Sequence, residues 1–195
     1  MQITTSPEQL SLKDTIICIG NFDGVHVGHQ MLLGHMQTLA QTHHKPSIVI
    51  TFFPPSKVFF QGGDFLSSEA EKLDLLRIYE PDAVVVIPFN EFYTHTPKED
   101  FLAQLAGLEP HTIIVGEDFR FGFKRQGTLN DLSHLPERLE VFGMKRIHGE
   151  EVKSTLIRQL LSEGNVEAVK PFLGRSYSAQ GVVVEGDKRG RTIGF

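Results

Sequence analysis

Residues 19–29 read IGNFDGVHVGH and connect an apolar run to a run of helix formers. The preceding TIICI, residues 15–19, is typical of a buried strand, and residues 30–40 carry apolar side chains at helical spacing. His26 and His29 therefore lie in the opening turn of a predicted helix. Free backbone N–H groups and the positive end of the helix dipole favour anions there, so the stretch predicts a phosphate-binding site.

The glycines and histidines of this stretch form a specific pattern. It resembles the GxFDxxHxGH signature of the nucleotidylyltransferase superfamily, and the longer GNFDGVHxGHQ is similar to the FMN adenylyltransferase module of bacterial bifunctional FAD synthetases. The resemblance implies that His26 and His29 contact the phosphates of ATP. The residues around them are expected to bind the nucleotide, with glycines that let phosphate oxygens approach the backbone: Gly20, Asn21, Phe22, Asp23, Gly24 and Gly28. Asp23 either orients a histidine or stabilises the turn, and the sequence leaves both roles open.

Length and composition describe an ordinary globular chain. Its 195 residues suit one domain with an appendage, and 40% of them are hydrophobic. The one cysteine, Cys18, lies in the apolar run, so we expect a core residue, no disulfide and a reducing, cytoplasmic setting. No stretch resembles a signal peptide or a membrane span. The net charge of −5 argues against nucleic acid as a partner, and we expect neither membrane association nor an obligatory protein partner.

Apolar runs alternate with helical stretches along most of the chain. Further strands are expected at residues 48–53, 83–87, 112–115 and 138–144, and helices at 69–79 and 97–106. Continuous apolar strands, each followed by a helix, predict an α/β fold with a Rossmann-like parallel sheet covered on both faces. Ligands of such sheets bind beyond the carboxyl ends of the strands, so the loops after the first four strands should form one rim.

A second stretch, VKSTLIRQLL at residues 152–161, also suits anion binding. Ser154 or Thr155 can cap a helix whose first turns carry Arg158, which brings hydroxyls, free amides and a guanidinium near one anion. Beside the histidine motif it resembles the ISSTxxR signature of the same superfamily, with Lys153 where the family usually has serine. The resemblance implies that Ser154, Thr155 and Arg158 join the two histidines as catalytic residues that hold the ATP phosphates. It implies Mg²⁺ as the cofactor, bridging phosphate oxygens, with no metal ligand assigned to the chain.

The flavin side of the expected site depends on aromatic residues and on loops. Phe119 and Phe121 alternate with Arg120, which suits an aromatic wall for an isoalloxazine ring, although a half-buried edge strand gives the same pattern. The family usually reads TFxPHP after the second strand, whereas this chain has Pro55 and Ser56 in place of the histidine and the second proline. The expected flavin contacts are Phe53, Pro54, Asn90, Asp118, Phe119, Arg120 and Phe121.

The last part of the chain resembles a different module. A helix is expected over residues 163–174, a strand over 175–185 and a glycine-rich turn over 186–191. This pattern looks like the opening of the riboflavin kinase module that follows the adenylyltransferase in the bifunctional enzymes, and the chain stops before that family's PTAN segment. We therefore expect an FMN adenylyltransferase domain at 1–173, a truncated kinase-like β module at 174–195, and no riboflavin kinase activity.

The implied reaction is transfer of AMP from ATP to FMN, which gives FAD and pyrophosphate. Such a reaction needs positioning and charge stabilisation rather than a protein nucleophile. Two alternatives remain open. One is adenylyl or cytidylyl transfer to another phosphorylated acceptor, and the other is a flavin- and nucleotide-binding regulatory protein without turnover, which the change at Pro55 and Ser56 would suit.

Overall fold

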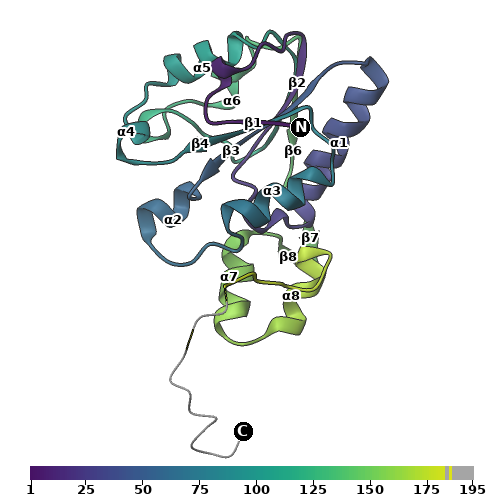
Figure 1. Cartoon of the computed structure of the whole chain (residues 1–195), viewed down its shortest axis with the longest axis vertical. Coiled ribbons are helices and arrows are strands. Elements are labelled where there is room, and N and C mark those ends of the chain that lie inside the picture. Colours follow the sequence, from purple (N-terminus) through teal and green to yellow (C-terminus); the bar gives the residue numbers. More distant parts are fainter. Residues whose placement is uncertain (183–184, 186–195) are drawn as a thin grey trace, which may run out of the picture.

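A computed structural model describes residues 1–182 and residue 185. Its centre is a six-stranded sheet in the order β1-β4-β3-β2-β5-β6, in which every neighbouring pair is parallel (Figure 1). The strands are β1 (Gln2–Thr4), β2 (Thr15–Ile19), β3 (Ser47–Phe53), β4 (Ala83–Pro88), β5 (Pro110–Gly116) and β6 (Arg138–Phe142). The predicted α/β fold with a parallel sheet is confirmed. A separate antiparallel pair follows β6, formed by β7 (Arg146–Ile147) and β8 (Glu150–Glu151).

Helices cover both faces of the sheet. Side chains on one face pack against α1 (Val27–His43) and α3 (Glu69–Arg77), and those on the other pack against α5 (Lys98–Ala106). Within β2, the Cys18 side chain lies in the apolar cluster that contains α1 and α3, and the Ile17 side chain lies in the cluster that contains α5. Burial on both faces is the reason that the strands read as continuous apolar runs rather than as alternating ones.

The order of strands reverses at β2. From β2 the chain adds β3 and β4 on one side, and it then returns to add β5 and β6 on the other side. The loops after β2 and β5 therefore diverge at the carboxyl edge of the sheet, where ligands bind in folds of this kind. Residues 20–29 follow β2 directly, so the fold brings the histidine motif to this position.

Several elements differ from the sequence prediction. The first helix is longer than expected, because α1 ends at His43 rather than at residue 40. Strand β6 ends at Phe142 rather than at residue 144. Three helices were not predicted, because they are too short to give a periodic signal: α2 (Ser56–Gln61), α4 (Glu91–Thr94) and α6 (Leu129–Leu132).

A helical pair lies at one end of the molecule, beside β7 and β8 (Figure 1). It consists of α7 (Ser154–Ser162) and α8 (Val166–Leu173), whose apolar side chains form a third cluster with Leu66. The strand expected over residues 175–185 is wrong for residues 175–182, which form neither helix nor strand. There the Gln180 N–H donates to the Glu71 carboxylate of α3 (2.8 Å), so the segment follows α3 instead of joining a sheet. Residues 183–184 and the glycine-rich turn predicted at 186–191 lie outside the described residues.

Candidate active site

The turn after β2 is organised around the buried carboxylate of Asp23. Its side chain is 2% exposed, and its two oxygens accept hydrogen bonds from the Leu66 backbone N–H (2.9 Å) and from Arg158 Nη2 (2.7 Å). The Ser154 hydroxyl donates to the Asp23 carbonyl (3.1 Å). Asp23 thus joins the turn to the segment before α3 and to α7. Of the two roles left open for Asp23, stabilising the turn is the one that these contacts match.

Two glycines of the motif make room for neighbouring side chains. Gly24 has a φ of +71°, and a Cβ at this position would lie 2.9 Å from the Leu66 side chain. A Cβ at Gly28 would lie 3.3 Å from the ring of His26. Gly24 is therefore favoured by its backbone conformation and by packing, whereas a side chain at Gly28 would require a small shift of the His26 ring.

The two histidines of the motif form a stacked pair, in which the side chain of His26 is buried and that of His29 is half-buried. Their ring centroids lie 3.5 Å apart with an interplanar angle of 14°. His26 is the N-cap residue of α1, and its Nδ1 accepts a hydrogen bond from the His29 backbone N–H (3.3 Å). Burial lowers the pKa of His26 to about 4, with a further lowering by the charge of Arg175. Burial also lowers the pKa of His29 well below its ordinary value, and the neighbouring His26 and Lys72 act in the same direction.

Both imidazoles are therefore neutral near neutral pH. Because Nδ1 of His26 accepts a hydrogen bond, its ring proton is assigned to Nε2, which leaves an N–H donor. The Nδ1 atom of His29 is buried and has no hydrogen-bond partner among the described residues. The pair thus offers polar ring atoms at the start of a helix, as the sequence predicted.

The N-terminus of α7 lies against this turn, but its cap differs from the prediction. The N-cap position is Lys153, whose side chain makes no capping bond, so the prediction that Ser154 or Thr155 caps the helix is wrong. The Ser154 hydroxyl bonds the Asp23 carbonyl instead, and Thr155 Oγ1 accepts a hydrogen bond from Lys57 Nζ (2.8 Å). The first turn of α7 therefore keeps backbone N–H groups without a side-chain cap.

Asn21 connects the motif to the loop after β3. Its Oδ1 accepts a hydrogen bond from the Ser56 backbone N–H (3.2 Å), and its carbonyl accepts one from the Thr51 hydroxyl (3.0 Å). Phe53 and Pro54 precede this contact and are joined by a cis peptide bond. Asn90 follows β4 and caps α4 through the Tyr93 N–H (2.9 Å).

The segment after β5 divides into exposed and buried residues. Asp118 and Arg120 are exposed, and Arg120 Nη1 donates to the Phe119 carbonyl (2.7 Å). Phe121 is 7% exposed and contacts Phe101 in the core and Phe119 beside it. Phe121 therefore contributes to packing, whereas Phe119 and the two charged residues can reach a ligand.

Two cations that the sequence did not indicate, Lys72 and Arg175, donate hydrogen bonds to backbone carbonyls of the motif. Lys72 of α3 donates to the carbonyls of Asn21 and Phe52, both at 2.9 Å. Arg175 donates to the carbonyls of Gly24 (2.7 Å) and Val25 (3.1 Å). The one available signal for Lys72 was its helical spacing from the buried Leu76, because backbone carbonyls leave no trace in a sequence.

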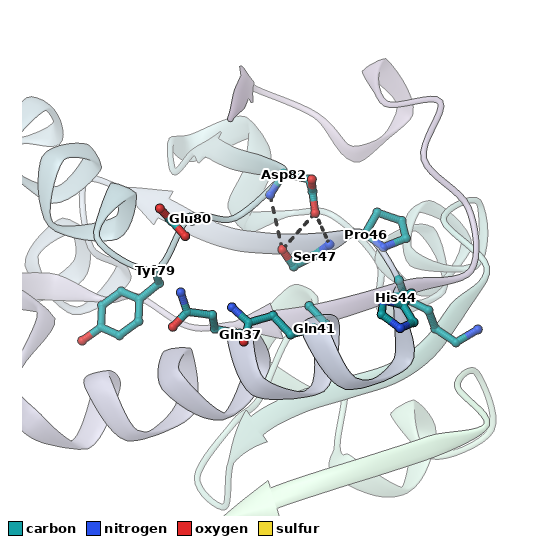
Figure 2. Close-up of a pocket in the computed structure, with 10 residues that line it drawn as sticks. Gln37, Gln41, His44, Pro46, Ser47, Tyr79, Glu80 and Asp82 are labelled. Carbon is teal, nitrogen blue, oxygen red and sulfur yellow. Dashed lines mark hydrogen bonds between the residues drawn. The ribbon is translucent and has the colours of Figure 1, made fainter.

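A pocket of about 370 Å³ lies away from the motif. It is at the amino end of β3, where Ser47 and Asp82 are hydrogen-bonded and Gln37 and Gln41 of α1 line the wall (Figure 2). The motif faces the carboxyl ends of the strands, so this pocket is separate from the candidate site.

No group of three or more His, Cys, Asp or Glu side chains among the described residues is arranged to hold a metal ion. No helix in that part of the chain combines the length and the apolar character needed to cross a membrane.

Comparisons with known proteins identify the family. The FAD synthetase family model matches residues 8–158, which include both of the motifs predicted to bind anions. A Buchnera aphidicola protein named bifunctional riboflavin kinase/FMN adenylyltransferase is 32% identical over 192 residues, which are 94% of this chain and 61% of that protein. A Geobacillus thermodenitrificans relative is 34% identical over 89% of this chain and 97% of its own length.

A solved structure has the same fold over almost the whole chain. It is a Streptococcus pneumoniae protein named macrolide-efflux protein, with a TM-score of 0.83 and 25% identity over 98% of this chain and 66% of that chain. This chain spans about 61% of the length of the Buchnera relative. With a family model that covers both motifs and relatives that match along most of its length, the chain belongs to the FAD synthetase family.

Proposed function

We propose that this protein transfers AMP from ATP to FMN and releases FAD and pyrophosphate. The observation that carries the proposal is the neutral, stacked pair of His26 and His29 at the start of α1, which Asp23 links to the start of α7. Two helix N-termini and two imidazoles then converge on one place, which suits a polyphosphate. The name FMN adenylyltransferase, carried by the Buchnera relative, supports the same activity.

The proposed reaction is an in-line displacement. A phosphate oxygen of FMN attacks the α-phosphorus of ATP, the bond to the bridging oxygen breaks, and its electron pair leaves with pyrophosphate. Fixed donors that bind the phosphate oxygens more strongly in the transition state lower the barrier. The Nε2–H of His26 is such a donor, held by the bond between its Nδ1 and the His29 N–H. We assign the His29 ring, stacked on it, to the same phosphate group.

We assign the β- and γ-phosphates to α7. Arg158 contributes a guanidinium whose Nε has no partner among the described residues, and Ser154 and Thr155 contribute hydroxyls in the first turn. Lys57 is added to this group, because its ammonium already lies 2.8 Å from Thr155 Oγ1. No protein nucleophile is needed, and burial raises the pKa of the Cys18 thiol, which keeps it unreactive.

The donor set suits Mg²⁺ held mainly by the nucleotide. Asp23 is the one carboxylate in the turn, and both of its oxygens already accept hydrogen bonds. Mg²⁺ commonly binds through substrate phosphates and water with few protein ligands. When bound, it would neutralise charge on the phosphate oxygens.

We propose that FMN binds between the loops after β3, β4 and β5. The residues that would contact it are Phe53, Pro54, Asn90, Asp118, Phe119 and Arg120, which the sequence also selected. Phe121 would support Phe119 from the core, where the two rings stack with centroids 5.7 Å apart. A cytoplasmic setting is proposed from the single, buried cysteine.

The test is formation of FAD by the purified protein. FMN, ATP and Mg²⁺ are mixed, and FAD and pyrophosphate are measured together by chromatography and a coupled assay. We expect equal amounts of both products, with His26→Ala strongly reduced and the exposed His134→Ala unchanged. CTP in place of ATP, and other phosphorylated acceptors in place of FMN, test the related transfer reactions.

One observation favours a second candidate, a binding protein without turnover. Pro55 and Ser56 replace the usual histidine and proline, and Ser56 is engaged with Asn21. A protein of this kind would bind ATP and FMN in calorimetry but form no FAD. Detection of FAD above the level of the His26→Ala variant excludes it.

A further inference from the structure

Lys72 is a buried lysine for which the proposed reaction gives no direct role. Its side chain is 0% exposed on α3, in the helix that covers one face of the sheet. Lysine is almost never fully buried unless it is paired, because an ammonium loses its hydration there. No ion pair of Lys72 occurs within 4.0 Å among the described residues. Its partners are instead two backbone carbonyls, of Asn21 and of Phe52.

Those two carbonyls belong to different parts of the proposed site. Asn21 lies in the turn that carries the histidines, and Phe52 lies at the end of β3, directly before the loop assigned to FMN. Nζ of Lys72 is 2.9 Å from each carbonyl oxygen and 5.5 Å from the centre of the Phe53 ring. One ammonium therefore holds the ends of two neighbouring strands, β2 and β3, at the edge where both substrates would meet.

Charged and titratable groups surround Lys72 on several sides. The carboxylates of Asp23 in the turn and of Glu69 on its own helix raise the pKa of Lys72. The charge of Lys72 in turn lowers the pKa of His29 on α1. Burial nevertheless lowers the pKa of Lys72 to about 8. The ammonium can thus lose its proton at mildly alkaline pH.

We propose that Lys72 is a positioning residue for adenylyl transfer, whose protonated ammonium holds the nucleotide turn and the flavin loop in one alignment. The inference rests on the proposed function. We assign Lys72 no contact with a substrate, because its side chain is fully buried and two of its three N–H donors are directed to backbone carbonyls. Its loss should therefore affect the rate of transfer between bound substrates more than the binding of either one.

Two substitutions separate the charge from the volume. Lys72→Met keeps an unbranched apolar stem but removes the ammonium from both carbonyls, and the Asn21 carbonyl keeps its bond from the Thr51 hydroxyl. Lys72→Arg keeps several N–H donors and a charge that does not titrate below about pH 12. Arg77→Met is the matched control, since it removes an exposed cation from the same helix.

The experiment measures FAD formation by the complete chain over about pH 6 to 10, together with ATP and FMN affinities by calorimetry. We expect wild-type kcat/KM to fall above about pH 8, because this quantity reports ionisations of the free enzyme. Lys72→Arg should retain activity without that fall. Lys72→Met should lose kcat on the order of 10-fold at about pH 7, with both affinities changed less than about 3-fold.

A purely structural role predicts a different result. Lys72→Met would then unfold at lower urea concentration, while the folded fraction kept wild-type kcat and the wild-type alkaline fall. That outcome overturns the inference, and so does an alkaline fall that persists unchanged in Lys72→Arg. If Lys72→Met does not fold, the pH profile of kcat/KM for Lys72→Arg alone decides whether the inference holds. Absence of FAD formation by the wild-type protein at every pH would overturn the proposed function and this inference with it.

Discussion

Replacing Asp23 by Asn tests whether the buried ion pair with Arg158 holds the candidate site together. The substitution keeps an oxygen that can accept from the Leu66 N–H, now 2.9 Å from Oδ1. It places an NH₂ group where Oδ2 now accepts from Arg158 Nη2 at 2.7 Å. Two donors would then face each other in a buried place, and the guanidinium would lose its counterion.

The expected cost follows from the burial of both partners. Removing one member of a buried pair costs about 3–5 kcal/mol, because the remaining charge stays desolvated. The Asp23 side chain is 2% exposed but that of Arg158 is 22% exposed, so water can solvate part of the unpaired guanidinium. We therefore expect a loss of about 2–3 kcal/mol in the free energy of unfolding, which for a chain of this size lowers Tm by roughly 4–12 °C.

The assay is a double-mutant cycle in urea. Unfolding is followed by circular dichroism for wild type, Asp23→Asn, Arg158→Gln and the double variant. A coupling energy of about 1–2 kcal/mol is expected, with Asp74→Asn, from the exposed pair with Arg77, costing about 0.5 kcal/mol or less. Single-variant effects that add within about 0.5 kcal/mol would refute the coupling between the turn and α7.

Three further predictions concern the histidines and the altered loop. His26→Ala or His29→Ala should lower FAD formation on the order of 100-fold while circular dichroism stays unchanged, because each removes a preorganised donor to a developing charge; wild-type turnover in both variants would refute the assignment. Pro55→His, with Ser56 kept for its bond to Asn21, should raise kcat/KM for FMN roughly 10-fold and leave the ATP parameters alone; an equal change for both substrates would contradict this. As the pH falls, the unfolded chain binds a proton at His26 near the ordinary pKa of 6.5, whereas the folded protein binds it only near 4, so His26 alone should lower the stability by about 3 kcal/mol between these pH values. Urea titrations of wild type and His26→Ala check this last point, since the variant, which keeps His29, should lose about 3 kcal/mol less than wild type over the same interval.

The parts of the fold that the sequence predicted are those that a local pattern encodes. Strand β2 was placed correctly because TIICI is buried on both faces. The helix after it was located because the apolar positions of α1 repeat at helical spacing, and His26 and His29 lie in its opening turn as predicted. The sequence did not indicate that His26 is the N-cap, because histidine is not a common capping residue.

The parts that the sequence could not predict depend on contacts between distant segments. Lys72 was read as one polar residue in a helix, because its partners are distant carbonyls. Asn21 lies 51 residues and Phe52 lies 20 residues before it in the chain. Arg175 was placed in a strand, whereas its guanidinium binds the turn 150 residues earlier. Neither interaction has a counterpart in local periodicity, since any residue supplies a backbone carbonyl.

The histidine turn is held by side chains from three separate segments, and this bears on the limits of the domain. Its carbonyls accept hydrogen bonds from Lys72 of α3, from Ser154 of α7 and from Arg175 after α8. Phe22 and Val25 have left-handed backbone conformations, with φ values of 46° and 37°, which non-glycine residues adopt only when their surroundings impose them. The local sequence alone therefore does not fix the turn; the later segments do. A boundary at 173/174 would separate Arg175 from the carbonyls that it binds, so the proposed adenylyltransferase domain is better taken to include residues 174–180.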